Sequence, residues 1–111
     1  IKELKNGMFL GVLVDQDTQV ESKIIDFLGV PAKTPVGPAI LAQKFNCYLL
    51  TLFALRMEDG YYKIIINKPY ENIEKETIEN LAKKYNNEIS EMIKKYPTQW
   101  AWIHNRWKSI F

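Results

Sequence analysis

The sequence is poor in the residues that would mark a disulfide-stabilised, membrane-spanning or nucleic-acid-binding protein. Its single cysteine, Cys47, excludes an internal disulfide framework and suggests a reducing compartment. Because Cys47 opens an apolar run, we expect it to be buried and inert. The longest apolar runs fall far short of the roughly 20 residues of a membrane-spanning helix. Fifteen basic residues nearly cancel 13 acidic ones, which gives no sign of a nucleic-acid partner.

The length and composition indicate one domain, or part of one, with a modest core. The chain has 111 residues, of which 47% are hydrophobic, an ordinary fraction for a globular protein. It begins with Ile1 and shows no signal peptide. We expect it to be part of a longer chain.

The pattern of apolar residues predicts an α/β fold, with a mixed β-sheet flanked by helices. Apolar runs between turn signals favour strands, and apolar residues repeated at three- and four-residue steps favour a long helix. The expected strands lie near 8–14, 23–27, 47–56 and 61–67, the expected helices near 36–46 and 73–96, and a short tryptophan-rich helix is expected at the C-terminus.

Chain breakers set the expected limits of the elements in the first half. Gly29 and Pro31 are expected to end the strand near 23–27. Thr34-Pro35 is expected to begin the following helix, because proline is tolerated in a first helical turn. Asn46 is expected to end that helix as a left-handed cap.

Similar signals limit the elements of the second half. Glu58-Asp59-Gly60 predicts a turn between the two strands of an antiparallel hairpin. Asn72 is expected to cap the long helix, and Pro97 to end it. The apolar face predicted for this helix consists of Ile78, Leu81, Tyr85, Ile89, Met92 and Tyr96.

An acidic cluster follows the first apolar run. The run Met8–Val14 stops abruptly at Asp15-Gln16-Asp17. A continuous apolar run of this length fits a strand covered on both faces, and α/β proteins build their sites at the carboxyl ends of such strands. The alternative is an acidic surface loop, because Asp and Gln are common in loops.

The tail of the chain gathers rare residues. All three tryptophans, Trp100, Trp102 and Trp107, lie within eight residues, together with the only histidine, His104, and one of two arginines, Arg106. One interpretation is a helix that covers the core, since large aromatic side chains bury much area. A second is an interfacial helix that turns its basic residues toward lipid headgroups. A third makes His104 a catalytic base, although no nearby carboxylate is spaced to orient it.

These motifs together carry a family resemblance. They occur in the order Asp15-Gln16, Asp26-Phe27-Leu28-Gly29-Val30-Pro31-Ala32, Thr34-Pro35-Val36-Gly37-Pro38-Ala39, Leu41-Ala42, Arg56, Gly60-Tyr61-Tyr62 and Pro97-Thr98-Gln99-Trp100-Ala101-Trp102-Ile103-His104-Asn105-Arg106-Trp107-Lys108. Over nearly all 111 residues the chain resembles the C-terminal half of the bacterial lipid A biosynthesis acyltransferases, the lauroyl and myristoyl transferase family. The tail is the most specific part of the resemblance.

The resemblance implies a fold and an activity. The expected fold is the C-terminal part of a glycerol-phosphate-acyltransferase-like fold, with residues 1–111 forming the second half of one domain. The expected reaction moves a fatty acyl chain from acyl carrier protein, or acyl-CoA, to a hydroxyl of a lipid A precursor or related glycolipid. The expected place is the membrane surface at the cytoplasmic face of the bacterial inner membrane. No cofactor, metal or nucleic acid is implied.

The resemblance also implies that the catalytic base lies elsewhere. The family uses a histidine followed after four residues by Asp or Glu, in which the carboxylate orients the imidazole that deprotonates the acceptor hydroxyl. His104 has Ser109 at the corresponding position. We therefore expect the pair to lie upstream of this stretch, and these 111 residues to be inactive alone.

The resemblance assigns roles to four residues. Asp15 matches the family aspartate at a strand end and is the candidate catalytic residue, where it could orient the base or a cationic partner. Gln16, Arg56 and Arg106 are the candidate substrate-binding residues. A guanidinium at Arg56 suits phosphates of the sugar acceptor or of the donor. The alternative for Arg56 is a surface ion pair with Glu58-Asp59, worth at most about 1 kcal/mol.

Two other functions compete with this interpretation. The first is an acyltransferase of the same superfamily that acts on a phosphatidylinositol mannoside or a lysophospholipid. The second is a non-catalytic membrane-surface or partner-binding module, with the tryptophan-rich tail as its anchor.

Overall fold

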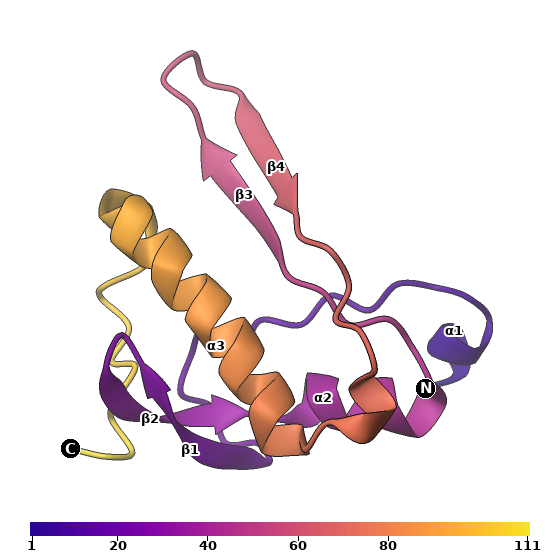
Figure 1. The fold of residues 1–111 in the computed structure, drawn as a ribbon. Coiled ribbons are helices and arrows are strands. Elements are labelled where there is room, and N and C mark those ends of the chain that lie inside the picture. Colours follow the sequence, from indigo (N-terminus) through magenta and orange to yellow (C-terminus); the bar gives the residue numbers. More distant parts are fainter.

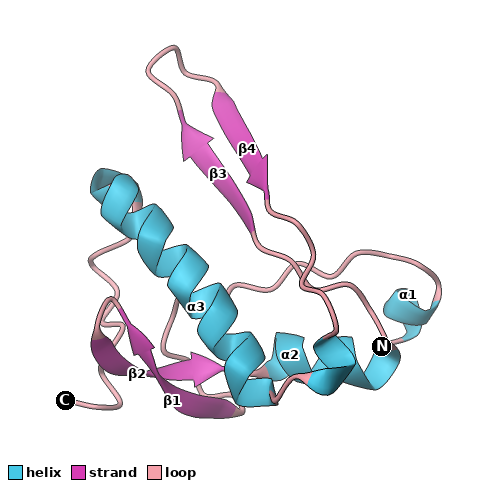
Figure 2. Ribbon diagram, viewed as in Figure 1, coloured by secondary structure: helices cyan, strands magenta, loops and turns pink.

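A long helix that lies across a β-hairpin organises the fold in the computed structural model, which describes residues 1–111 (Figure 1). Helices and strands both contribute, as the predicted α/β class requires (Figure 2). The elements are α1 (Lys2–Lys5), β1 (Ser22–Phe27), β2 (Val30–Pro35), α2 (Gly37–Phe45), β3 (Leu52–Arg56), β4 (Tyr62–Ile66), the 3-10 turn η1 (Ile73–Lys75), α3 (Ile78–Lys95) and the 3-10 turn η2 (Pro97–Gln99).

The strands form two separate antiparallel hairpins, so the predicted single mixed sheet is wrong. One pairs β1 with β2 and the other pairs β3 with β4. The second hairpin rises away from the rest of the chain in Figure 1. The strand expected near 47–56 begins only at Leu52, and the one expected near 61–67 is confirmed as Tyr62–Ile66.

The first hairpin contains a strand that the sequence did not predict. Residues Leu28 and Gly29 both have positive φ, 54° and 80°, so the two-residue turn matches the twist of the strands it joins. The chain then continues as β2, although a break was expected at Pro31. Pro31 pairs with Asp26, next to the pair that flanks the turn. Both strands of a two-stranded sheet are edge strands, and edge strands accept proline.

Helix α2 confirms the helix expected near 36–46. Pro38 lies in its first turn, where the missing N–H costs no helical hydrogen bond. Asn46 ends it with φ 51° and ψ 46°, the predicted left-handed cap.

Helix α3 is confirmed, but it begins later than expected. Its N-cap is Thr77, whose side-chain oxygen accepts a hydrogen bond from the N–H of Asn80 at 3.0 Å. Asn72 instead precedes the turn η1 and makes no side-chain cap. The helix ends at Lys95, before Pro97, as predicted. Its buried residues are Leu81, Ala82, Tyr85, Asn86, Ile89, Ser90 and Ile93.

The core consists of two apolar clusters along α3. The larger one fills the space between α3, α2 and the first hairpin. The smaller one gathers around Phe27 and receives half-buried Trp100 and Trp107 from the tail. The larger cluster contains Ile25, Val36, Ala39, Ala42, Ile73, Leu81, Ala82 and Tyr85, and the smaller contains Phe27, Ala32, Ile89 and Ile93.

The predicted buried strand Met8–Val14 is wrong in this structure. The segment forms no regular element, and no backbone group from Phe9 to Val14 is hydrogen-bonded to another backbone group. Leu13 is 81% exposed and Phe9 is fully exposed. An apolar run becomes a buried strand only where other elements cover both its faces, and here only Val14 touches the core.

The predicted tryptophan-rich helix is also wrong, because the tail after η2 runs through successive turns. Trp102 donates its indole N–H to the carbonyl of Pro97 at 2.6 Å, which folds the tail back on the end of α3. None of the helices in the structure combines the length and the apolar character that crossing a bilayer requires.

Candidate functional site

The tail lies against the acidic segment, and Asp17 is the point where they join. Its carboxylate accepts hydrogen bonds from the N–H and the Oγ of Ser109, at 2.8 and 2.9 Å. Its own N–H donates to Nε2 of His104 at 3.1 Å. Burial alone raises the pKa of Asp17, but the two bonds from Ser109, with the charges of Lys108 and Lys33, hold that pKa below its usual value.

Asp15, two residues before Asp17, also contacts the tail. The indole N–H of Trp100 donates to one carboxylate oxygen of Asp15 at 3.0 Å. The carboxylate is half-buried, and its other oxygen makes no hydrogen bond within the chain. It can therefore still accept a proton donor, as the orienting partner of a base must. Gln16, between the two aspartates, is half-buried and its side chain makes no hydrogen bond within the chain.

Aromatic packing fixes the position of Trp100. Its ring centroid lies 5.6 Å from that of Phe27 and 4.7 Å from that of Trp102, the latter edge-to-face. Phe27 also contacts Trp107, with centroids 6.0 Å apart. The interpretation of the tail as a cover for the core therefore describes Trp100 and Trp107, whereas Trp102 is 53% exposed.

Arg106 is fully buried beneath this aromatic group. Its guanidinium stacks 4.6 Å above the ring centroid of Phe27. It donates to the carbonyl of Lys33 at 2.6 Å and to Oγ1 of Thr34 at 3.2 Å. Burial lowers its pKa, an effect that the charges of Asp17 and Asp15 oppose. In this conformation a substrate could reach Arg106 only if the tail moved, so its role in binding stays a prediction.

A buried polar network continues from Arg106 to α3. The side-chain amide of Asn86 donates to Oγ1 of Thr34 at 2.8 Å and to the carbonyl of Asp26 at 3.2 Å. The network thus joins the tail, both strands of the first hairpin and the middle of α3. These hydrogen bonds fix the tail, which contacts the acidic segment, against the first hairpin and α3.

Arg56 lies on the second hairpin, at the end of β3. It is exposed, and its side chain forms no ion pair, so the expected alternative of a pair with Glu58-Asp59 is not observed. Its backbone is held by Gln99. The Arg56 N–H donates to Oε1 of Gln99 at 2.8 Å, and Nε2 of Gln99 donates to the Arg56 carbonyl at 3.0 Å. The guanidinium is free to meet an anion.

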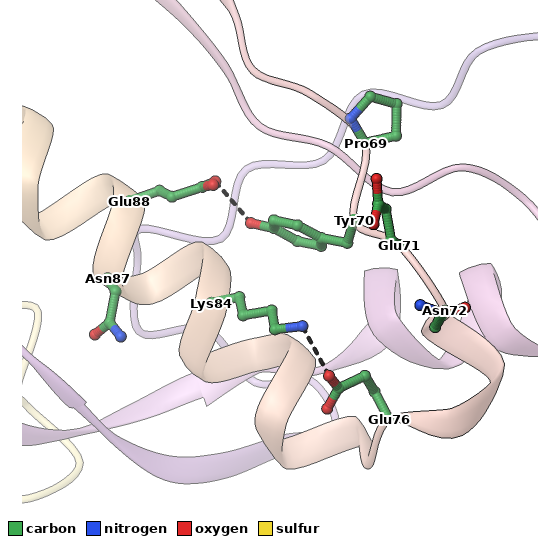
Figure 3. A pocket seen from close by; sticks show the side chains of 8 residues that line it. All are labelled: Pro69, Tyr70, Glu71, Asn72, Glu76, Lys84, Asn87 and Glu88. Carbon is green, nitrogen blue, oxygen red and sulfur yellow. Dashed lines mark hydrogen bonds and ion pairs between the residues drawn. The ribbon is translucent and has the colours of Figure 1, made fainter.

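A polar hollow of about 640 Å³ opens elsewhere, between α3 and the segment that follows the second hairpin (Figure 3). Tyr70 donates to Glu88 at 2.7 Å across it, and Lys84 pairs with Glu76 at 2.8 Å. Burial and the carboxylate of Glu88 raise the pKa of Tyr70, whereas the hydrogen bond and charge of Lys84 lower that of Glu76. Asp15 does not line this hollow.

No group of three His, Cys, Asp or Glu side chains in the structure is placed to hold a metal ion. Cys47, expected to be buried, is half-buried and unpaired.

The comparison with protein families places the chain among acyltransferases. A model of the family described as bacterial lipid A biosynthesis acyltransferase matches residues 1–109, and the chain belongs to this family. No curated protein matches the chain. The family assignment predicted from the motifs is confirmed, and at this level the protein is a transferase of lipid A biosynthesis.

The structure brings together some of the predicted site residues. Asp15 contacts the tail through Trp100, Arg106 of the tail interacts with the charges of Asp17 and Asp15, and the backbone of Arg56 is bound by Gln99 of the tail. No hydrogen-bonding contact of the Gln16 side chain with the tail is observed. The prediction missed Trp100 and Gln99 as the partners of Asp15 and Arg56. It also gave no role to Asp17, which His104 and Ser109 hold. A cluster of rare aromatic and basic residues in the tail was the only signal in the sequence.

Proposed function

We propose that the gene product carrying this chain transfers a fatty acyl chain from acyl carrier protein or acyl-CoA to a hydroxyl of a lipid A precursor or a related glycolipid. The match of the lipid A acyltransferase family over residues 1–109 carries the proposal. The proposal extends to a glycerol-phosphate-acyltransferase-like fold for the whole domain, of which this chain is the C-terminal half. It also places the reaction at the cytoplasmic face of the bacterial inner membrane.

In the proposed reaction, a histidine outside these residues takes the proton of the acceptor hydroxyl. The oxygen then attacks the thioester carbonyl, the tetrahedral intermediate collapses, and the thiol of the donor leaves with a proton. Asp15 orients the imidazolium or a cationic partner through its unbonded oxygen, because a fixed carboxylate stabilises the charge that forms. Arg56 binds a phosphate of the acceptor or of the donor, a geometry that guanidinium groups favour.

The test is acyl transfer by the gene product that carries this chain, followed by mass spectrometry of the lipid product. Acyl carrier protein and CoA thioesters are each supplied with a lipid A precursor. Asp15→Asn is expected to lower the rate on the order of 10²-fold or more, as loss of an orienting carboxylate does elsewhere. The matched control is Asp26→Asn, whose exposed side chain makes no hydrogen bond within the chain.

Three outcomes would count against this proposal. Transfer to no lipid A precursor with either donor would exclude the reaction. Equal rates for Asp15→Asn and Asp26→Asn would remove Asp15 from the mechanism. Transfer by residues 1–111 alone would show that no upstream base is needed.

The second candidate function is a membrane-surface module anchored by the tail. The exposed side chains of Trp102 and Ile103 are the observation that favours it. Co-sedimentation with anionic vesicles tests it, with Trp102→Ala as the main variant and Trp100→Ala and Trp107→Ala as comparisons. Binding that is absent, or that is indifferent to Trp102→Ala, would exclude the anchor.

A further inference from the structure

Two consecutive residues of the tail, Gln99 and Trp100, hold two of the candidate site residues, Arg56 and Asp15. The side chain of Gln99 pairs with both backbone groups of Arg56, at 2.8 and 3.0 Å. The next residue, Trp100, donates its indole N–H to the carboxylate of Asp15 at 3.0 Å. Because consecutive Cα atoms lie about 3.8 Å apart, one short piece of chain connects the second hairpin to the acidic segment.

This piece of chain is itself fixed at both ends. Helix α3 ends at Lys95, and Pro97 opens the turn η2, whose last residue is Gln99. On the other side, the ring of Trp100 packs on Phe27, a buried residue of β1. The hairpin bearing Arg56 rises away from the first hairpin (Figure 1). The two hydrogen bonds with Gln99 hold the backbone of this strand end at Arg56.

We propose that Gln99 and Trp100 are positioning residues, Gln99 for Arg56 and Trp100 for Asp15. Together they set where the phosphate-binding guanidinium stands relative to the orienting carboxylate. The proposal rests on the proposed acyl transfer for its kinetic consequences. Its physical part, that Gln99 holds Arg56 and Trp100 holds Asp15, is independent of any activity.

Hydrogen exchange measured by NMR tests the physical part. Gln99→Ala should make the Arg56 amide exchange at least about tenfold faster, since its acceptor is lost. The amide of Met57 should not change, because it donates to Tyr61 within the hairpin. Asp15→Asn should shift the indole N–H resonance of Trp100 and leave that of Trp107, which donates to Val30, in place.

Kinetics of the gene product test the positioning. Trp100→Phe keeps an aromatic ring against Phe27 but loses the donor to Asp15, and should lower kcat about tenfold or more with little change in KM. The matched control is Trp107→Phe, which also packs on Phe27 and loses an indole N–H but does not touch Asp15. Gln99→Ala should instead raise KM for the phosphorylated substrate. Gln99→Glu, which keeps the acceptor for the Arg56 N–H, should recover part of the loss.

A double variant separates positioning from damage to the fold. If Trp100 acts through Asp15, then Trp100→Phe with Asp15→Asn should be no slower than Asp15→Asn alone. Additive losses, or equal effects of Trp100→Phe and Trp107→Phe, would overturn the role of Trp100. An unchanged Arg56 amide in Gln99→Ala would overturn that of Gln99. If the wild-type protein showed no acyl transfer, the proposed function would be refuted. The NMR experiments would still show whether Gln99 holds Arg56 and whether Trp100 holds Asp15.

Discussion

The backbone N–H of Asp17 donates a hydrogen bond to Nε2 of His104, at 3.1 Å and across 87 positions of the chain. Because Nε2 is the acceptor, the neutral imidazole carries its proton on Nδ1. Ser109, five residues after His104 in the tail, donates to the carboxylate of Asp17. The only histidine of the chain therefore holds a loop in place, and its Nε2 is occupied.

Removing this acceptor should destabilise the fold. His104→Ala leaves the N–H of Asp17 unpaired in a buried position, which should lower the free energy of unfolding by about 1–3 kcal/mol. Urea denaturation, monitored by tryptophan fluorescence, measures this change in the free energy of unfolding. The matched control is Ile103→Ala, whose side chain is fully exposed and should change stability by less than about 0.5 kcal/mol. Equal midpoints for the two variants would show that the His104 contact contributes nothing.

The carboxylate of Asp17 should make stability depend on pH in the acid range. Its pKa is lower in the folded chain than the ordinary value of 3.8, so the folded state prefers the ionised form. That stabilisation is fully present above the ordinary pKa and is lost as the pH falls through the folded pKa. Asp17→Asn cannot ionise and should show a shallower loss of stability below about pH 4. Denaturation midpoints at several acid pH values measure this, and the same slope in both proteins would contradict it.

Arg106 should be sensitive even to replacement by lysine. Arg106→Ala removes the stacking on Phe27 and the hydrogen bonds to Lys33 and Thr34, which should cost about 3–5 kcal/mol. Arg106→Lys keeps the charge but has neither a planar face nor a fork of donors, and should lose about 1–2 kcal/mol or more. Thermal unfolding measures both. A fully stable Arg106→Lys would show that charge alone matters at this position.

The elements predicted correctly are those with strong local signals. Helix α3 has a regular apolar repeat and a following proline, α2 has a proline in its first turn and Asn46 after it, and the turn around Gly60 joins β3 to β4. Each signal acts over a few residues, so the sequence alone contains enough information to place the element.

The elements predicted wrongly depend on distant partners. The turn before β2 requires Leu28 at positive φ, and its N–H donates to Oγ of Ser90, 62 positions away. No pattern near Leu28 shows this. The run Met8–Val14 has the composition of a buried strand, but burial depends on what covers it, which composition does not specify.

The same limit applies to the candidate site. Asp15, Gln16, Arg56 and Arg106 were identifiable by their positions in family motifs, but the contacts that hold them were not. The bonds from Ser109 to Asp17 span 92 positions, and that from Trp100 to Asp15 spans 85. Contacts at such separations follow from tertiary packing, which single-sequence patterns do not encode.

The exposed apolar run offers a direct comparison between sequence pattern and structure. Leu13 is 81% exposed, so Leu13→Ser removes almost no buried area in these 111 residues and should change the free energy of unfolding by less than about 0.5 kcal/mol. Leu81→Ala, at a fully buried position of α3, should cost about 2–5 kcal/mol because it leaves a cavity. Urea denaturation of the two variants measures both values. If Leu13→Ser were as damaging as Leu81→Ala, the run would be a buried strand as its composition predicts, and the exposed segment would be the wrong description.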